Sequence, residues 1–89
     1  MAKAKTFARG DWFEDVSEHG KGEKYILMCV ATPCKMTLIA WPRLGPYASP
    51  VEVRNISKIT EREFDQITQG TMADFVQIAR PKRISVPQN

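Results

Sequence analysis

Residues Lys24-Tyr-Ile-Leu-Met-Cys-Val-Ala31 and Lys35-Met-Thr-Leu-Ile-Ala-Trp41 decide the fold of this chain. The first stretch is apolar at successive positions, which predicts a central strand that is buried on both faces. The second stretch is also rich in strand formers. Thr32-Pro33 breaks the run between them. Two short apolar runs around such a break predict a tight β-hairpin.

Further strands are predicted on both sides of this hairpin. Residues 12–16 form a short strand candidate before a polar loop at 17–23, and residues 51–59 alternate as a strand does after a proline-rich loop at 42–50. Asn55-Ile56 marks a shift in register within the second of these strands. Residues 72–79 fit either a helix or a strand, and a strand over 74–79 is favoured because Phe, Val and Ile are good strand formers.

One short helix is predicted over residues 61–69. Thr60 and Glu63 have the spacing of a capping box, in which each side chain binds a free backbone N–H at a helix start. Ile59 and Phe64 are spaced as a hydrophobic staple. Phe64 and Ile67 share one face, which we expect to be buried. Gly70 is a natural helix end.

The predicted order is strand, loop, hairpin, loop, strand, helix and strand, which makes the chain mainly β with one short α-helix. This order resembles the small five-stranded, partly open barrel of Src-homology-3-like proteins. The layout, with Gly10-Asp-Trp12, Pro50-Val-Glu-Val53 and the helix start at 59–64, is similar to small proteins of phages and mobile elements. The resemblance covers about residues 10–79. It implies binding of peptides, proteins or nucleic acid rather than catalysis.

Charge divides the 89 residues into a body and two basic ends. Segment 1–9 carries Lys3, Lys5 and Arg9 without an acid, and segment 80–89 carries Arg80, Lys82 and Arg83 without an acid. The body between them is mildly acidic, although the whole chain carries a net charge of +3. We therefore expect one folded domain over 10–79 with flexible basic segments at 1–9 and 80–89.

The residues needed for catalysis and for metal binding are not combined in this sequence. Its one histidine, His19, lies in a glycine-rich polar loop, and Glu14 and Asp15 point to opposite faces of a strand. Cys29 and Cys34 make half of a zinc site. In a reducing cytosol they are expected as thiols, although oxidation could join them across the hairpin. We expect no enzyme activity, no catalytic residue, no metal and no cofactor.

The expected compartment is the cytoplasm. No apolar run approaches the roughly 20 residues of a membrane helix. The first residues are basic, but no apolar stretch follows them, so they do not resemble a signal peptide. We therefore expect no membrane association.

The loop that begins at Trp41 is the candidate partner-binding site. Trp41, Arg43 and Tyr47 are of the types that most often anchor protein interfaces, and the prolines around them restrict the loop. An alternative is that Trp41 and Tyr47 close one end of a small core. We expect a protein partner. A second copy of the chain is an alternative partner, because exposed edge strands favour dimers.

Nucleic acid is the other alternative partner. Its phosphates would be bound by Lys3, Lys5, Arg9, Arg80, Lys82 and Arg83, and its bases would stack on Trp41 or Tyr47. The mildly acidic body places this alternative behind a protein partner, because a domain that binds nucleic acid with its fold usually has a basic face.

Overall fold

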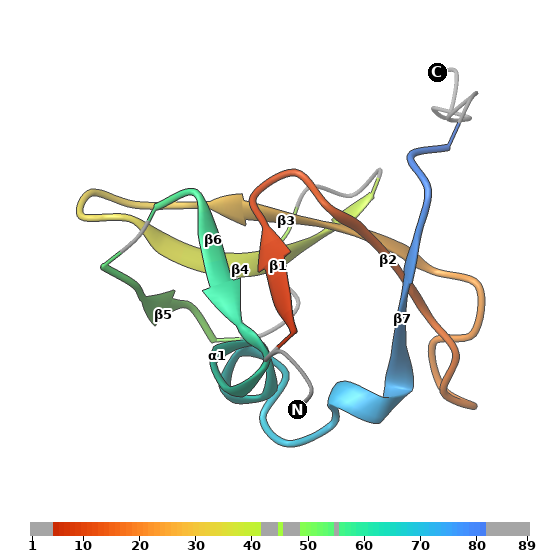
Figure 1. The fold of residues 1–89 in the computed structure, drawn as a ribbon. Helices are drawn as coiled ribbons and strands as arrows, with labels where there is room; N and C mark the ends of the chain where they lie inside the picture. Colours follow the sequence, from red (N-terminus) through yellow and green to blue (C-terminus); the bar gives the residue numbers. More distant parts are fainter. Residues whose placement is uncertain (1–4, 42–44, 46–48, 55, 82–89) are drawn as a thin grey trace.

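The computed structural model describes residues 5–41, 45, 49–54 and 56–81. These residues form a mainly β fold with two sheets that do not close into a barrel (Figure 1). Five strands form one sheet in the order β5-β4-β3-β2-β7, and two form the other in the order β1-β6. The elements are β1 Thr6–Ala8, β2 Trp12–Asp15, β3 Lys24–Cys29, β4 Lys35–Trp41, β5 Val51–Glu52, β6 Lys58–Thr60, α1 Glu61–Ile67, η1 Met72–Asp74 and β7 Phe75–Ile78.

The predicted hairpin is confirmed as β3 and β4, which pair along their length from Lys24 with Trp41 to Cys29 with Met36. β3 is the middle strand of the five-stranded sheet, as its apolar sequence predicted. Leu27 and Leu38 lie opposite each other and are fully buried. The outward face of β3 is more open than expected, since Met28 is 40% exposed.

The open choice between helix and strand at 72–79 is resolved by a short 3-10 helix, η1, followed by strand β7. β7 pairs with β2 in an antiparallel register that places Phe75 opposite Asp15 and Ile78 opposite Trp12. The preferred strand is therefore confirmed over Phe75–Ile78.

The ordered fold begins earlier than expected. Within segment 1–9, which we expected to be flexible, Thr6–Ala8 form β1 and pair with β6. Phe7 lies opposite Ile59 and is 4% exposed. A single phenylalanine between polar and small residues was too weak a pattern to predict a strand, and the strand is formed because this ring enters the core.

The single strand expected over 51–59 is wrong. Its two ends are separate strands in different sheets, because β5 pairs with β4 and β6 pairs with β1. Ile56 and Ser57 lie in the turn that separates the sheets, and Asn55 lies outside the described residues. The chain therefore leaves the five-stranded sheet after Val53, which is buried and donates from its backbone to Cys34 O at 3.4 Å.

The capping box is confirmed in atomic detail. Glu63 N donates to Thr60 Oγ1 at 3.2 Å, and Thr60 N donates to Glu63 Oε1 at 2.7 Å. Both expected core residues of α1 are buried, with Phe64 1% exposed and Ile67 fully buried. Gly70 ends the helical segment with a φ of 83°, and its N–H donates to Asp65 O at 2.9 Å. Gly70 can adopt this left-handed backbone because it has no Cβ.

The core lies between the five-stranded sheet and the layer formed by β1, β6 and α1 (Figure 1). Three phenylalanine rings meet at its centre, with centroid distances of 5.4 Å for Phe7 and Phe13, 4.6 Å for Phe7 and Phe64, and 4.7 Å for Phe13 and Phe64. Phe75 meets Phe64 edge-on at 6.4 Å. Three strands and the helix therefore share one aromatic cluster, and β6 adds Ile59 to the same core.

Candidate functional site

Of the three candidate residues in the loop, Trp41 is the one that the structure places. It is the last residue of β4, lies opposite Lys24 of β3 and is half-buried. Its ring meets Trp12 edge-on at a centroid distance of 6.0 Å. Its Nε1 atom is buried and has no hydrogen-bond partner within the described part of the chain. Arg43 and Tyr47 lie outside the described residues.

Trp41 belongs to the face of the five-stranded sheet that points away from the core. Strand residues alternate between the two faces. Phe13, Tyr25 and Leu38 point into the core, so their neighbours point outward. The strand register aligns four of these outward residues in one row across β7, β2, β3 and β4. We call them the outer row: Ile78, Trp12, Ile26 and Ile39.

The outer row is apolar and well packed, although it is no part of the core cluster. Trp12 is 6% exposed and Ile39 is 7% exposed, while Met28 and Val76 on the same face are 40% and 44% exposed. Antiparallel sheets commonly turn a polar face to water. Glu14 and Lys24 lie opposite each other and place two charged residues at one end of this face.

The apolar outer face was not among the features predicted from the sequence, although the signal was present. Trp12, Ile26 and Ile39 are apolar residues that stand next to core residues in their strands. The sequence alone does not fix which residues of different strands lie opposite each other. The apolar character of both faces of β3 was taken only as a sign of burial.

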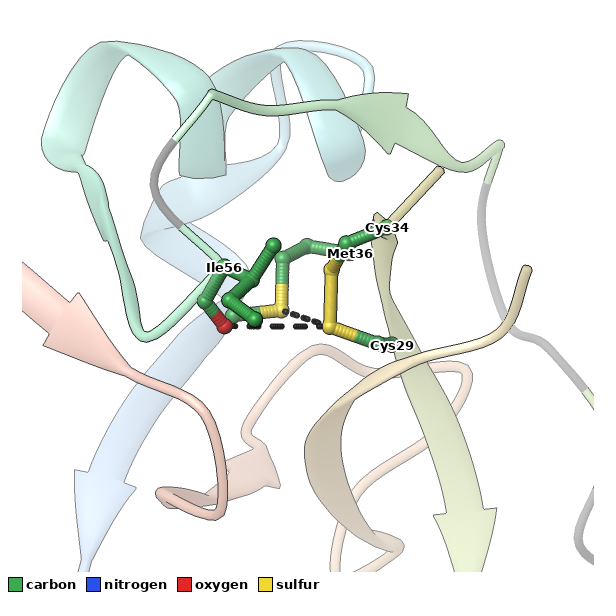
Figure 2. The surroundings of a disulfide bond; sticks show 4 residues. All are labelled: Cys29, Cys34, Met36 and Ile56. Carbon is green, nitrogen blue, oxygen red and sulfur yellow. Dashed lines mark hydrogen bonds between the residues drawn. A yellow bond between two sulfur atoms is a disulfide. The ribbon is translucent and has the colours of Figure 1, made fainter. Parts of the chain in front are cut away.

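Cys29 and Cys34 are joined by a disulfide, so the expectation of two thiols is corrected and the alternative across the hairpin is realised. Their Cα atoms are 5.2 Å apart. Figure 2 shows the bond beside Met36 and Ile56, where Cys29 Sγ lies 3.8 Å from Met36 Sδ and 3.8 Å from Ile56 O. Both sulfur atoms are used in the bond, which closes the hairpin turn between β3 and β4 and lies against the backbone at Ile56.

No candidate metal centre is formed by residues 5–41, 45, 49–54 and 56–81, where no three His, Cys, Asp or Glu side chains gather. His19 is exposed in the turn that joins β2 to β3. Neither helix within the described residues has the length and apolar character needed to cross a membrane.

Asp15 is a buried carboxylate, whereas its sequence predicted only that it points to the opposite face of the strand from Glu14. It is 1% exposed, and its Oδ1 atom accepts hydrogen bonds from Ser17 N at 2.8 Å and Ser17 Oγ at 2.6 Å. A Cβ atom added at Gly20 would overlap its Oδ2 atom. The carboxylate therefore organises the turn after β2, as aspartates commonly do in turns. The spacing Asp15-Val-Ser17 was the available signal.

The basic residues of the nucleic-acid alternative are placed in part. Lys5, Arg9 and Arg80 are exposed, whereas Lys3, Lys82 and Arg83 lie outside the described residues. Lys5 Nζ lies over the Phe7 ring, 5.3 Å from its centroid. Lys5 and Arg9 flank β1, and Arg80 follows β7. The nucleic-acid alternative stays a prediction.

Comparison with protein families, with curated proteins and with solved structures finds no match to this chain.

Proposed function

We propose that this chain is a non-enzymatic protein-interaction module. It presents the outer face of its five-stranded sheet, together with the loop from Trp41 through Arg43 to Tyr47, to a protein partner. The observation that carries the proposal is the pair of exposed apolar side chains on this face, Met28 at 40% and Val76 at 44%, beside the half-buried Trp41. Apolar side chains that stay exposed next to one another commonly mark an interaction site.

Trp41 is suited to this role by its position at the edge of the outer face. Its ring packs against Trp12, which holds it in place before a partner binds. An anchor that is already ordered loses less conformational entropy on binding. The same contact agrees with the alternative that Trp41 closes one end of the fold, and the two roles are compatible because Trp41 is only half-buried.

The finer fold that we propose is a partly open Src-homology-3-like barrel. The order β5-β4-β3-β2-β7 supports it, since a meander of four strands is completed by the last strand after a helical segment. The layout of small phage and mobile-element proteins leads us to propose that the partner is a host or phage protein whose action the chain modulates. These are analogies of fold, and the outer face is the stronger support.

The test is affinity capture from a lysate of the source cells, with retained proteins quantified by mass spectrometry. The variants Trp41→Ala, Arg43→Ala and Met28→Lys are compared with the unchanged chain. Met28 is 40% exposed, so the lysine can reach water without disrupting the fold. Ile56→Lys is the matched control, because Ile56 is 52% exposed and lies in the turn before β6.

The proposal expects a partner that the unchanged chain and Ile56→Lys retain and that Met28→Lys and Trp41→Ala lose. Loss with Arg43→Ala would extend the surface along the loop. If all variants retain every captured protein, the outer face is not the binding surface. Thermal unfolding of each variant distinguishes loss of the surface from loss of the fold.

A further inference from the structure

β7 is an edge strand whose backbone is open on one side. Within the described sheet it pairs with β2 alone. Val16 N donates to Asp74 O at 2.7 Å, and the hydrogen-bonded pairs of an antiparallel ladder alternate along it. Val76 and Ile78 therefore bond to β2, while the N–H and C=O of Gln77 point away from it. Gln77 is exposed, so a further strand can reach these two groups.

The other strand edges within the described residues have features that hinder pairing. Edge strands are usually protected by short length, lysine, proline or a covering element. β5 has two residues and follows Pro50, and β6 contains Lys58 and runs directly into α1. The open edge of β1 is partly occupied, because Ala8 N donates to Asp11 Oδ2 at 2.9 Å. β7 has four residues without lysine or proline, and its Val76 is 44% exposed.

The sequence around β7 is self-complementary when two copies run antiparallel. Placing Gln77 of one copy opposite Gln77 of the other brings Val76 opposite Ile78. In the next outward pair, Asp74 lies opposite Arg80, and this charged pair occurs twice because a two-fold axis relates the copies. A shift by two residues in either direction, the smallest that keeps the open backbone groups facing each other, places an apolar residue of β7 opposite a charged one. Charge and apolar character therefore favour one register.

From this arrangement we infer that two copies of the chain associate through their β7 edges, with Gln77 at the two-fold axis. The two Gln77 residues exchange N–H and C=O groups, as opposite residues do in an antiparallel ladder. The two five-stranded sheets become one continuous sheet, and Val76 of each copy packs beside Ile78 of the other. Opposite residues of paired strands lie on the same face, so both outer faces are presented on one side of this sheet.

This inference goes beyond the proposed function. It concerns the edge of the five-stranded sheet rather than its outer face, and it names a second copy of the chain as the occupant of that edge. The dimer would present the proposed binding surface twice, which raises the apparent affinity for a partner that has two matching sites.

The experiment is sedimentation velocity of the unchanged chain and of variants between about 10 µM and about 1 mM, a range in which weak association is visible. Gln77→Pro removes the outward N–H, since proline is tolerated at the open edge of a strand. Gln77→Ala is its matched control, because both variants lose the side-chain bond to Asp11 Oδ2. Circular dichroism and thermal unfolding establish that each variant is folded.

Charge reversal tests the register and leaves the backbone unchanged. Asp74→Lys alone places a lysine opposite Arg80, and Arg80→Glu alone places a glutamate opposite Asp74, so each variant repels a second copy of itself. An equimolar mixture of the two variants restores opposite charges at both ends of the paired strands. These variants keep the proposal testable if Gln77→Pro fails to fold.

We expect the unchanged chain to form a species of twice the monomer mass. Gln77→Pro should raise the dissociation constant about tenfold or more, because two backbone hydrogen bonds are lost per dimer, and Gln77→Ala should change it by less than about threefold. Each charge reversal alone should raise it about tenfold or more, while their mixture should return it to within about threefold. Met28→Lys, on the outer face, should leave it unchanged.

Four results would overturn the inference. One is a chain that stays monomeric up to about 1 mM. Another is a dimer with equal dissociation constants for Gln77→Pro and Gln77→Ala. A third is a mixture of folded charge-reversal variants that fails to associate. The fourth is a dimer that Met28→Lys disrupts and the charge reversals do not, which would place the contact on the outer face.

Failure of this inference is distinguishable from failure of the proposed function. A monomeric chain that still loses a captured partner on Met28→Lys would overturn only the β7 dimer. A dimer that behaves as expected, in a chain whose variants retain every captured protein, would overturn only the proposed function.

Discussion

Replacing Thr60 with alanine removes the hydroxyl that starts α1. The Oγ1 atom accepts from Glu63 N at 3.2 Å and contacts Glu63 Oε1 at 3.1 Å, and Glu63 Oε1 in turn accepts from Thr60 N at 2.7 Å. Loss of a threonine N-cap typically costs about 1 kcal/mol. Water reaches this exposed site and replaces part of the lost bond, so we expect about 1 kcal/mol rather than the upper end of the range near 2 kcal/mol.

This loss should be visible because α1 has only seven residues and holds two buried core side chains, Phe64 and Ile67. For a chain of this length, about 1 kcal/mol lowers the midpoint of thermal unfolding by about 4–8 °C. Urea unfolding followed by circular dichroism measures the free energy directly. Thr60→Ser keeps the hydroxyl and should stay within about 0.3 kcal/mol of the unchanged chain.

A double-mutant cycle tests whether the two side chains act together. Thr60→Ala combined with Glu63→Ala should cost less than the two single changes added, by about 0.5 kcal/mol, because either change breaks the same reciprocal pair. Equal stability of Thr60→Ala and Thr60→Ser would refute the reasoning, as would strict additivity in the cycle.

Three further predictions concern turns and the disulfide. Gly20→Ala should lower the free energy of unfolding by about 1–3 kcal/mol, because the new Cβ displaces the buried Asp15 carboxylate, whereas Gly45→Ala, with open space at its Cβ, should be neutral in the same urea titration. Gln69→Gly should raise the free energy of unfolding by about 0.5–1 kcal/mol, because Gln69 has a left-handed φ of 59°. Gln66→Gly, within α1, should lower it by about 1 kcal/mol. Thermal unfolding of the two variants should therefore show shifts of the midpoint in opposite directions. The protein purified without reductant should show no reactive thiol by alkylation and mass spectrometry. Reduction by a dithiol should lower the free energy of unfolding by about 2 kcal/mol, because the disulfide closes a short loop. Alkylation of Cys29 or Cys34 before reduction would contradict the bond.

Local signals in the sequence were sufficient for the hairpin and the helix. The apolar runs at 24–31 and 35–41 surround a short break, and the pairing of β3 with β4 follows from their closeness in the chain. The helix start follows from two side chains three residues apart. In both cases the residues that determine the element lie close together in the sequence.

Pairings between distant segments could not be predicted in this way. β1 exists because β6 pairs with it and because Phe7 reaches a core built from other segments. The separation of 51–59 into β5 and β6 has the same origin, since alternation continues through Val53 although the chain changes sheets there. Tertiary contacts decided these elements, and a single sequence does not display them.

The candidate site was predicted in its residue types rather than in its extent. Trp41 lies at the edge of an apolar face, but that face is assembled by the register of four strands, which no local pattern specifies. The disulfide depended on oxidation state, which the spacing of Cys29 and Cys34 leaves open. The buried role of Asp15 depended on the tight approach of Gly20.

The pairing of β2 with β7 has a consequence for synthesis of the chain. β2 is among the first strands to leave the ribosome, but β7, its neighbour on one side, emerges only after most of the chain has been made. The β3–β4 hairpin can form during translation, because its two strands emerge together. Until β7 arrives, the nascent sheet has β2 at its edge, so fusion partners or stalling sequences placed directly after residue 78 would interfere with the last step of folding.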